Sequence, residues 1–541
     1  MKLGDISSTT ATRRKRRATL RRLISCCALL LLIALDTAQA GTELDFRQTR
    51  IRLERDFPPK TGLTPRDFQL FAQSLTGSKQ DEIIVAYNIG MHAHFLIYQA
   101  DPSTEDYMPQ ARYSVDAYHN EVLFAFGRIE SREHQNLILA HSGHIEYLPL
   151  IDGKVSPDPL ELLPHAMLES QRSACRYLDF TVDCDGDGID ELALPALDGP
   201  KLWRKTETGW TSIALPALEP KSYSRFLSND STPPDHGEKI SFSNVNETPG
   251  FFFQDFDSDG ARDLFRIDGL DAVAAQMENH WPHRLGKLSE QPVRIEAYRY
   301  QRGAFADEPG MIIEAAQRPG SQQFFCDVNG DGAPDRIETW ASSDPVSPLS
   351  WLRLYLAKPA DGDTYRISSG SNFVMRSKDP VGVHFYPDLN RDGRLDFFQV
   401  QWDYMIGSHD DMADIFLGQR LKLTLEGFIQ EAPGRWPDRP QIRRRLQSKN
   451  YSPEEGIFPL IDLEHDFDGD GAQDLAFLIE PDRLHVYRCD LQAMRFEDDT
   501  LTDISLPPGR QVFFKDINAD GRADILAFDI EKRIVELYIS K

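Results

Sequence analysis

The sequence has 541 residues, of which 40% are hydrophobic and 27% are charged. This composition is typical of a folded protein and excludes a disordered or fibrous chain. The formal net charge of −25 should repel DNA, RNA and anionic lipid, so we expect no nucleic-acid partner.

The first 40 residues have the pattern of a secretory signal peptide. A basic region at residues 13–22 precedes an apolar run at residues 23–35, and Ala38-Gln39-Ala40 supplies small residues for cleavage before Gly41. The apolar run is shorter than the roughly 20 residues that span a bilayer. We therefore predict a periplasmic or secreted protein with no membrane span after cleavage. Because residues 1–40 contain eight basic and two acidic residues, the remaining domain, 41–541, would have a net charge of −31.

Two segments near residues 67–100 and 121–152 each contain an apolar run, a polar loop and a second apolar run. This is the rhythm of six more regular repeats that follow them, and we interpret both segments as degenerate copies. Their loops contain few acidic residues. Glu82 aligns with position 9 but stands alone in its loop, so we predict no metal in these two loops.

Six later segments share the pattern D-x-[DN]-x-D-G-x-x-[DE], in repeats that begin near residues 178, 250, 322, 383, 461 and 511. A turn-forming role would explain Asp-Gly but not the acids at positions 1, 3, 5 and 9 together. The candidate ligands are the side chains at these four positions and the backbone carbonyl of position 7. Loop by loop they are Asp183, Asp185, Asp187, Ile189, Glu191; Asp255, Asp257, Asp259, Ala261, Asp263; Asp327, Asn329, Asp331, Ala333, Asp335; Asp388, Asn390, Asp392, Arg394, Asp396; Asp466, Asp468, Asp470, Ala472, Asp474; and Asp516, Asn518, Asp520, Arg522, Asp524.

The spacing of these oxygens suits Ca²⁺, which binds six to eight oxygens at about 2.3–2.6 Å. Side chains at positions 1, 3 and 5 of a tight loop can converge on one ion. Glycine at position 6 permits the sharp turn, and the acid at position 9 can close the site as a bidentate ligand. An EF-hand loop closes at position 12 and continues into a helix, whereas strand-like runs flank these loops. The sequence therefore predicts about six structural Ca²⁺ sites.

The repeats predict an all-β fold, namely a β-propeller of four-stranded blades. A single blade cannot bury both of its faces, so successive blades must stack around an axis. Eight loop-like segments predict eight blades, with seven as the alternative count. Only two strand-like runs follow the sixth loop. Residues 50–57 could therefore complete the last blade and cover its exposed edge.

Several features between the repeats have more than one interpretation. The stretches 158–174, 268–290 and 408–428 are predicted to contain helices. His141, His144 and Glu146 form an H-x-x-H-x-E run that could bind zinc, although polar strand and loop positions are the favoured interpretation. Cys326 and Cys489 could form a disulfide or remain as buried thiols.

A basic island interrupts this acidic chain between the fourth and fifth metal loops. We favour a solvated loop over a site for an anionic glycan or protein partner. The island comprises Arg435, Arg439, Arg443, Arg444, Arg445 and Lys449.

The six loops resemble the FG-GAP/VCBS repeats of integrin-α-type β-propellers, in a bacterial exported form. The acidic pattern is present in six places and the rhythm in two, over about residues 60–541. The FG and GAP sequences of the family are poorly matched here, and Phe126-Gly127 is a partial match to the first. The resemblance implies a seven- or eight-bladed propeller with Ca²⁺ between the first two strands of a blade. In that family the ions are usually structural and lie away from the main ligand surface.

The favoured function is a non-catalytic binding, adhesion or scaffold module that presents a propeller face to a protein or glycan. The sequence has no G-x-S-x-G, P-loop or G-x-G-x-x-G motif, and we predict no catalytic residues. A carbohydrate-active lyase or hydrolase and an envelope assembly factor are the alternatives, because the fold alone does not decide between them.

Overall fold

A computed structural model describes most of one compact unit, Phe46–Lys541. The predicted signal peptide lies outside the described residues. These are 44–53, 68–89, 92–101, 103–104, 106–116, 122–141, 143–164, 175–194, 201–215, 251–257, 259–268, 291–317, 321–333, 335–341, 349–359, 365–367, 370–378, 384–403, 420–449, 460–506, 511–529 and 532–541.

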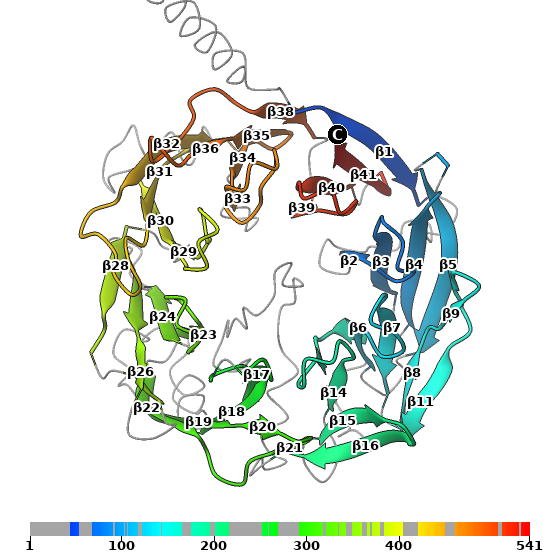
Figure 1. The fold of residues 1–541 in the computed structure, drawn as a ribbon. Coiled ribbons are helices and arrows are strands. Elements are labelled where there is room, and N and C mark those ends of the chain that lie inside the picture. The colour runs from blue at the N-terminus through cyan, green and yellow to red at the C-terminus, as the bar shows by residue number, and fades with distance from the viewer. Residues whose placement is uncertain are drawn as a thin grey trace, which may run out of the picture. The chain divides into compact units, whose positions relative to one another are not determined.

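Eight antiparallel sheets stand side by side in a ring, with the first strand of each innermost (Figure 1). This architecture confirms the predicted β-propeller with eight blades, and the alternative count of seven is wrong. Blade 1 contains β2 (Phe68–Gln73), β3 (Glu82–Ile89), β4 (His92–Ala100) and β5 (Tyr107–Asp116); blade 2 contains β6 (Val122–Gly127), β7 (Asn136–Ala140), β8 (His144–Tyr147) and β11 (Leu160–Pro164). Blade 3 contains β13 (Thr181–Val182), β14 (Glu191–Leu194), β15 (Lys201–Thr206) and β16 (Gly209–Ala214); blade 4 contains β17 (Phe251–Gln254), β18 (Asp263–Asp268), β19 (Gln291–Tyr298) and β22 (Met311–Gln317).

The second half of the ring repeats this arrangement. Blade 5 contains β23 (Gln322–Cys326), β24 (Asp335–Ala341), β25 (Ser350–Tyr355) and β28 (Phe373–Ser377); blade 6 contains β29 (His384–Phe385), β30 (Phe397–Trp402), β31 (Leu421–Phe428) and β32 (Ile442–Ser448). Blade 7 contains β33 (Ile461–Asp462), β34 (Leu475–Glu480), β35 (Arg483–Tyr487) and β38 (Thr502–Ser505); blade 8 contains β39 (Gln511–Lys515), β40 (Asp524–Asp529), β41 (Ile534–Ser540) and β1 (Phe46–Arg52).

Short additional strands extend two of the blades or form separate small hairpins. Strand β12 (Cys175–Tyr177) adds in parallel to β6, and β27 (Tyr365–Ile367) and β26 (Ala357–Pro359) extend blade 4. Three small hairpins are β9 (Leu150–Ile151) with β10 (Lys154–Val155), β20 (Tyr300–Gln301) with β21 (Ala304–Phe305), and β36 (Cys489–Asp490) with β37 (Arg495–Phe496).

The N-terminal strand closes the ring. Strand β1 pairs with β41 in antiparallel register from Phe46↔Ser540 to Arg52↔Ile534. The prediction that an N-terminal strand completes the last blade is confirmed. The predicted range 50–57 is displaced, because the strand begins earlier and ends at Arg52. The strand covers the edge that blade 8 would otherwise expose, because β41 is the last strand of the chain.

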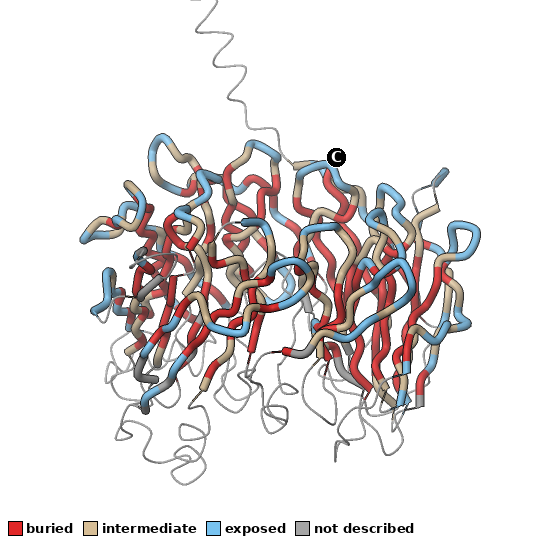
Figure 2. The backbone as a smooth tube through the Cα atoms, turned by 60° about the horizontal axis from the view of Figure 1, so that its bottom comes forward, coloured by how far each residue is buried: buried red, intermediate tan, exposed pale blue. Residues whose placement is uncertain are grey.

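The hydrophobic core lies between neighbouring blades. One cluster joins Ile51 and Leu537 of blade 8 to Leu70 and Val85 of blade 1. The second strands have continuous rather than alternating burial, as in β7 and β40, because other blades cover both of their faces. Figure 2 shows this as buried strands with exposed connecting loops. Each blade is thus held mainly by its two neighbours.

Some sequence predictions fail within the described residues. Segments 160–164 and 421–428 lie in predicted helical stretches but form strands β11 and β31. In β31 the residues Leu421, Leu423 and Leu425 alternate with polar or smaller ones and are buried, which is the period of a strand. Most of the remaining residues that were predicted to be helical lie outside the described residues, namely 165–174, 269–290 and 408–419. Cys184, Cys326 and Cys489 are free thiols, so the suggested Cys326–Cys489 disulfide is absent. Among the described residues no helix has the length and apolarity that crossing a membrane requires.

Candidate metal centres in the blade loops

Each of the six acidic loops connects the innermost strand of its blade to the second strand. Position 9 begins the second strand or directly precedes it, as Asp524 and Asp474 do. The six loops therefore occupy equivalent places in blades 3 to 8, on one end of the ring.

Backbone N–H groups hold the first aspartate of each loop. Its Oδ2 atom accepts a hydrogen bond from the glycine N–H at position 6, at distances of 2.7–2.9 Å. The six glycines have φ between 80° and 95°, a region that side-chain-bearing residues rarely adopt. Position 5 in turn accepts the N–H of position 7, for example 2.8 Å from Ala472 to Asp470. The glycines are Gly188, Gly260, Gly332, Gly393, Gly471 and Gly521.

Three loops bring carboxylate oxygens together closely enough to share an ion. In each loop one oxygen from each of three acids lies within 4.8 Å of the others. Oxygens bound to one Ca²⁺ at about 2.3–2.6 Å can be at most about 5 Å apart, so this spacing fits. Oδ1 of Asp257 is also buried with no hydrogen-bond partner among the described residues, as a cation ligand would be before binding. The trios are Asp183, Asp185, Glu191; Asp255, Asp257, Asp259; and Asp466, Asp468, Asp474.

The acid at position 9 ties its loop to the blade. One oxygen accepts the N–H of position 2, such as Phe467 to Asp474 at 3.0 Å. In five loops the other oxygen accepts an N–H from the last residue of the third strand or from two residues beyond it, such as Cys489 to Asp474 at 3.1 Å. The predicted bidentate ligand is therefore also a cross-link between the loop and the third strand. The other four acids with two such bonds are Asp263, Asp335, Asp396 and Asp524.

Burial raises the pKa of every position-9 acid. The pKa rises to about 7 for Glu191, Asp263 and Asp396, and to about 8 for Asp335 and Asp474. Desolvation is the main cause, and nearby loop aspartates add to it. A divalent cation beside such a group would favour its ionised form.

The six loops form two classes that differ at position 3 and in the third strand. In every loop-bearing blade, an aromatic residue of the third strand lies opposite the residue that follows position 9. The residue after this aromatic is arginine where position 3 is Asp. It is leucine or isoleucine where position 3 is Asn. The pairs are Asp185 with Arg204, Asp257 with Arg299, Asp468 with Arg488, Asn329 with Leu356, Asn390 with Ile429, and Asn518 with Ile539.

The arginines of the first class contact their aspartates directly. Nε of Arg299 lies 2.8 Å from Oδ2 of Asp257, and Nε of Arg488 donates to Oδ2 of Asp468 at 2.5 Å. Arg204 pairs with Asp185 through Nη2. In the second class the Asn amide instead donates to position 5, as Asn329 does to Asp331 at 3.0 Å. The extra carboxylate of the first class is thus matched by one guanidinium.

Backbone hydrogen bonds link the loops of neighbouring blades around the ring. The N–H of position 8 donates to the carbonyl of position 1 or 2 in the preceding loop, at 2.7–3.1 Å. These bonds occur at seven of the eight junctions. At the remaining junction, between blades 4 and 5, position 8 is Pro334, which has no N–H. The bonds run from Gln135 to Ser74, Asp190 to Arg128, Arg262 to Cys184, Leu395 to Val328, Gln473 to Leu389, Ala523 to Asp466, and Asp81 to Ile517.

In the two degenerate loops the residue at position 9 still holds its loop, although most other acids of the pattern are missing. Oε2 of Glu82 accepts the N–H groups of Leu75 and Thr76 at 2.7 and 3.1 Å, and Oε1 accepts the Thr76 hydroxyl at 2.5 Å. Glu82 is fully buried. In blade 2 the equivalent residue is Asn136, whose amide donates to Glu130 and to the Leu148 carbonyl. Position 9 therefore serves the blade fold even where the metal pattern is lost.

The structure also brings His141, His144 and Glu146 together at the β7–β8 turn. Nε2 of His141 is 2.9 Å and Nε2 of His144 is 3.5 Å from the Glu146 carboxylate. The two rings stack with centroids 4.5 Å apart, and the Tyr113 hydroxyl also donates to Glu146. The sequence placed these three residues at polar strand and loop positions. The contacts show that their side chains pack closely against one another.

Comparison with known proteins supports the repeat class. Residues 466–527, which include the fifth and sixth loops, match the FG-GAP-like repeat family. Together with the eight-bladed ring, this match supports a propeller built from FG-GAP-type repeats. No curated protein sequence matches this chain.

Three solved structures have remote similarity to the chain. A lectin from Agrocybe aegerita that recognises non-reducing terminal N-acetylglucosamine is 12% identical, with 82% of this chain and 81% of that chain covered and a TM-score of 0.33. The Photorhabdus luminescens Tc holotoxin pore is 11% identical, with 89% and 19% covered and a TM-score of 0.29. The exotype rhamnogalacturonan lyase YesX is 11% identical, with 91% and 76% covered and a TM-score of 0.32. Similarity at this level says nothing about ligand or reaction.

Proposed function

We propose that this protein is an exported, calcium-stabilised β-propeller that acts as a non-catalytic binding or scaffold module for a protein or glycan. The observation that carries the proposal is the set of six equivalent acidic loops, three of which bring carboxylate oxygens to the spacing that Ca²⁺ requires. Export rests on the signal-peptide pattern of residues 1–40. Ca²⁺ concentrations outside the cytoplasm suit loops of this type, which commonly bind in the 10⁻⁴–10⁻³ M range.

A structural role for the ions follows from where the loops lie. Each loop is bonded to its own third strand and, at most junctions, to the next loop. An ion that rigidifies one loop would therefore stabilise two blades. At ten times the Kd, each ion would contribute about 1.4 kcal/mol, and six ions would contribute about as much as the net stability of a domain.

Binding is favoured over catalysis because the loop carboxylates are engaged by the backbone. Position 1 accepts two N–H groups in the fifth loop, from Gly469 and Gly471. Acids fixed in this way suit a cation site better than proton transfer, which needs an acid that can reach a substrate.

The test is thermal unfolding of the mature protein, residues 41–541, in EDTA and in millimolar Ca²⁺, with equilibrium dialysis to count bound ions. We expect a melting temperature that rises by ten degrees or more on Ca²⁺ addition, and binding of about six ions. Mg²⁺ at the same concentration is the control for ionic strength. An unchanged melting temperature, or loops that stay empty at millimolar Ca²⁺, would contradict the proposal.

A further inference from the structure

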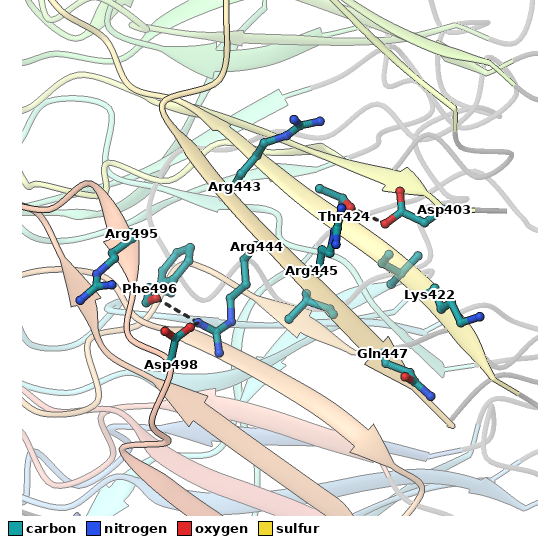
Figure 3. Close-up of a pocket in the computed structure, with 12 residues that line it drawn as sticks. Asp403, Lys422, Thr424, Arg443, Arg444, Arg445, Gln447, Arg495, Phe496 and Asp498 are labelled. Atoms are coloured by element: carbon teal, nitrogen blue, oxygen red, sulfur yellow. Dashed lines mark hydrogen bonds and ion pairs between the residues drawn. The ribbon is translucent and has the colours of Figure 1, made fainter.

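A cavity of about 990 Å³ lies at the outer side of blades 6 and 7 (Figure 3). Its walls come from β31, the outermost strand β32 and the small hairpin β36–β37. Five of the lining side chains are basic and two are acidic, in a chain with a net charge of −25. Half of the basic island that the sequence predicted as a solvated loop, Arg443, Arg444 and Arg445, therefore lies in strand β32 and lines a pocket. The charged lining residues are Lys422, Arg443, Arg444, Arg445, Arg495, Asp403 and Asp498.

We propose that this cavity binds an acidic oligosaccharide, in which sugar carboxylates alternate with free hydroxyl groups. The inference deepens the proposed binding role and rests on it, but it does not depend on Ca²⁺ being present.

Two of the arginines have structural partners. Arg444 donates to the carbonyls of Phe496 and Glu497 at 2.9 and 2.6 Å, and its guanidinium lies 3.9 Å from the centre of the Tyr487 ring. Its side chain is only 13% exposed. Arg443 pairs with Glu426, with Nε 2.9 Å from Oε1. Arg444 therefore fixes the hairpin of blade 7 against blade 6 and gives the cavity a rigid wall.

Two other arginines are available to a ligand. Arg445 and Arg495 are exposed, and within the described part of the chain neither side chain has an ion pair or hydrogen bond to another residue. In Figure 3 they lie on either side of Arg444, from β32 and β37 respectively. A free guanidinium presents two parallel N–H donors that match a carboxylate. Two of them that are separated in this way suit a ligand with repeated acidic groups.

The acidic and polar wall residues select the kind of anion. Asp403 accepts the Thr424 hydroxyl at 2.5 Å, and Asp498 has a side chain that is 94% exposed. These carboxylates would repel a polyphosphate, which has a charge on every unit and no hydrogen-bond donors. They can accept hydrogen bonds from sugar hydroxyls. The combination of free arginines with nearby aspartates therefore favours an acidic sugar.

The cavity also has the extent that an oligomer needs. Successive residues of a strand point to opposite faces, so Arg443 and Arg445 emerge on one face of β32 and Arg444 on the other. The pocket follows this edge strand to the hairpin (Figure 3). Several sugar units would be needed to contact both Arg445 and Arg495, and a single small anion would contact one.

The test is isothermal titration of the mature protein with a trimer of mannuronic acid, with mannotriose as the neutral trimer of the same sugar geometry. Both titrations use the same Ca²⁺ buffer. We expect the acidic trimer to bind and mannotriose to bind at least tenfold more weakly. Arg445→Gln and Arg495→Gln should each lower the affinity about tenfold or more, because each removes a charge-assisted hydrogen bond. Arg112→Gln is the matched control, because Arg112 is exposed on the outermost strand of blade 1 and should leave binding unchanged.

The results of these titrations distinguish the proposed acidic sugar from the alternative ligands. Equal affinity for the acidic and neutral trimers, or full affinity in both arginine variants with unchanged melting temperatures, would overturn the inference. Triglutamate that binds as tightly as the sugar would assign the cavity to acidic peptides and would also overturn it. If the acidic trimer does not bind but Ca²⁺ still raises the melting temperature, the inference is wrong and the calcium-stabilised propeller stands.

Discussion

Arg488, at the end of the third strand of blade 7, donates from Nε to Oδ2 of Asp468 at 2.5 Å. Asp468 is the third-position acid of the fifth metal loop, and its side chain is only 4% exposed. Ion pairs likewise join Arg299 to Asp257 and Arg204 to Asp185. Loops with asparagine at position 3 replace the arginine by an aliphatic residue. The chain therefore keeps the balance of charge similar in two chemically different loops.

Changing Arg488 to the aliphatic residue of the other class should have opposite effects on the protein without and with Ca²⁺. Arg488→Leu leaves Asp468 nearly buried without its partner, so we expect a loss of about 2 kcal/mol of stability in EDTA. Removal of a positive charge beside the ligands should at the same time raise the affinity of this loop for Ca²⁺ several-fold. Denaturant unfolding in EDTA and calorimetric titration with Ca²⁺ measure the two effects.

The double variant Asp468→Asn/Arg488→Leu is the control, because it rebuilds the asparagine class within blade 7. It should recover most of the stability that the single variant loses in EDTA. Strictly additive losses in this double-mutant cycle would show that the two residues do not interact.

A substitution at position 5 of a loop tests whether the acid there binds the ion or only supports the loop. Asp470 is exposed, and its Oδ1 accepts the Ala472 N–H at 2.8 Å. Asp470→Asn can keep this bond but removes the charge. We expect one Ca²⁺ fewer by equilibrium dialysis at sub-millimolar Ca²⁺, and a change in stability in EDTA of no more than about 0.5 kcal/mol. Asp482→Asn, in the exposed β34–β35 turn of the same blade, should change neither quantity. A full complement of ions in Asp470→Asn would remove this residue from the ligand set.

Glu82 tests the contacts between position 9 and its own loop apart from any metal. Glu82→Ala leaves the N–H groups of Leu75 and Thr76 without their acceptor, and we expect a loss of about 3 kcal/mol. Glu82→Gln keeps an oxygen for these N–H groups and should cost about 1 kcal/mol. Both values should be the same in EDTA and in Ca²⁺. Dependence of the loss on Ca²⁺ would instead indicate that the first degenerate loop binds an ion.

The closing strand should be essential to the ring. A shortened chain that begins at residue 54 lacks β1 and the buried side chains of Ile51 and Leu53, which are 3% and 0% exposed. We expect a melting temperature at least ten degrees lower and a tendency to aggregate through the uncovered edge of β41. Arg52→Ala, which changes an exposed residue of the same strand, should behave like the unmodified protein. Light scattering during thermal unfolding distinguishes the two results.

Sequence could predict the ring and its loops because both follow from local spacing. Acids at positions 1, 3 and 5 with glycine at position 6 specify the turn wherever it occurs, and six copies require a repeat architecture. The partner arginines were missed because the chain between them and their aspartates varies, from 19 residues for Asp185 and Arg204 to 42 for Asp257 and Arg299. The usable signal was the aromatic residue followed by Arg or by Leu or Ile near the end of each third strand.

The basic cavity lay beyond sequence prediction for a different reason. Arg445 and Arg495 are 50 residues apart and come from two blades, so only the packing of blade 7 against blade 6 places them along one pocket. The strand pattern around Leu421 was visible, in contrast, as alternating apolar and polar residues. The helical interpretation of residues 408–428 overlooked that period.

Pro334 removes the loop-to-loop bond between blades 4 and 5, but strands connect these two blades instead. Strand β27 pairs with β22 of blade 4, and β26, which pairs with β27, follows the third strand of blade 5. Coupling between neighbouring units therefore passes through a sheet at this junction and not through a metal loop. Amide exchange in β22 and β27 should consequently depend less on Ca²⁺ than exchange at the junctions that the loops connect.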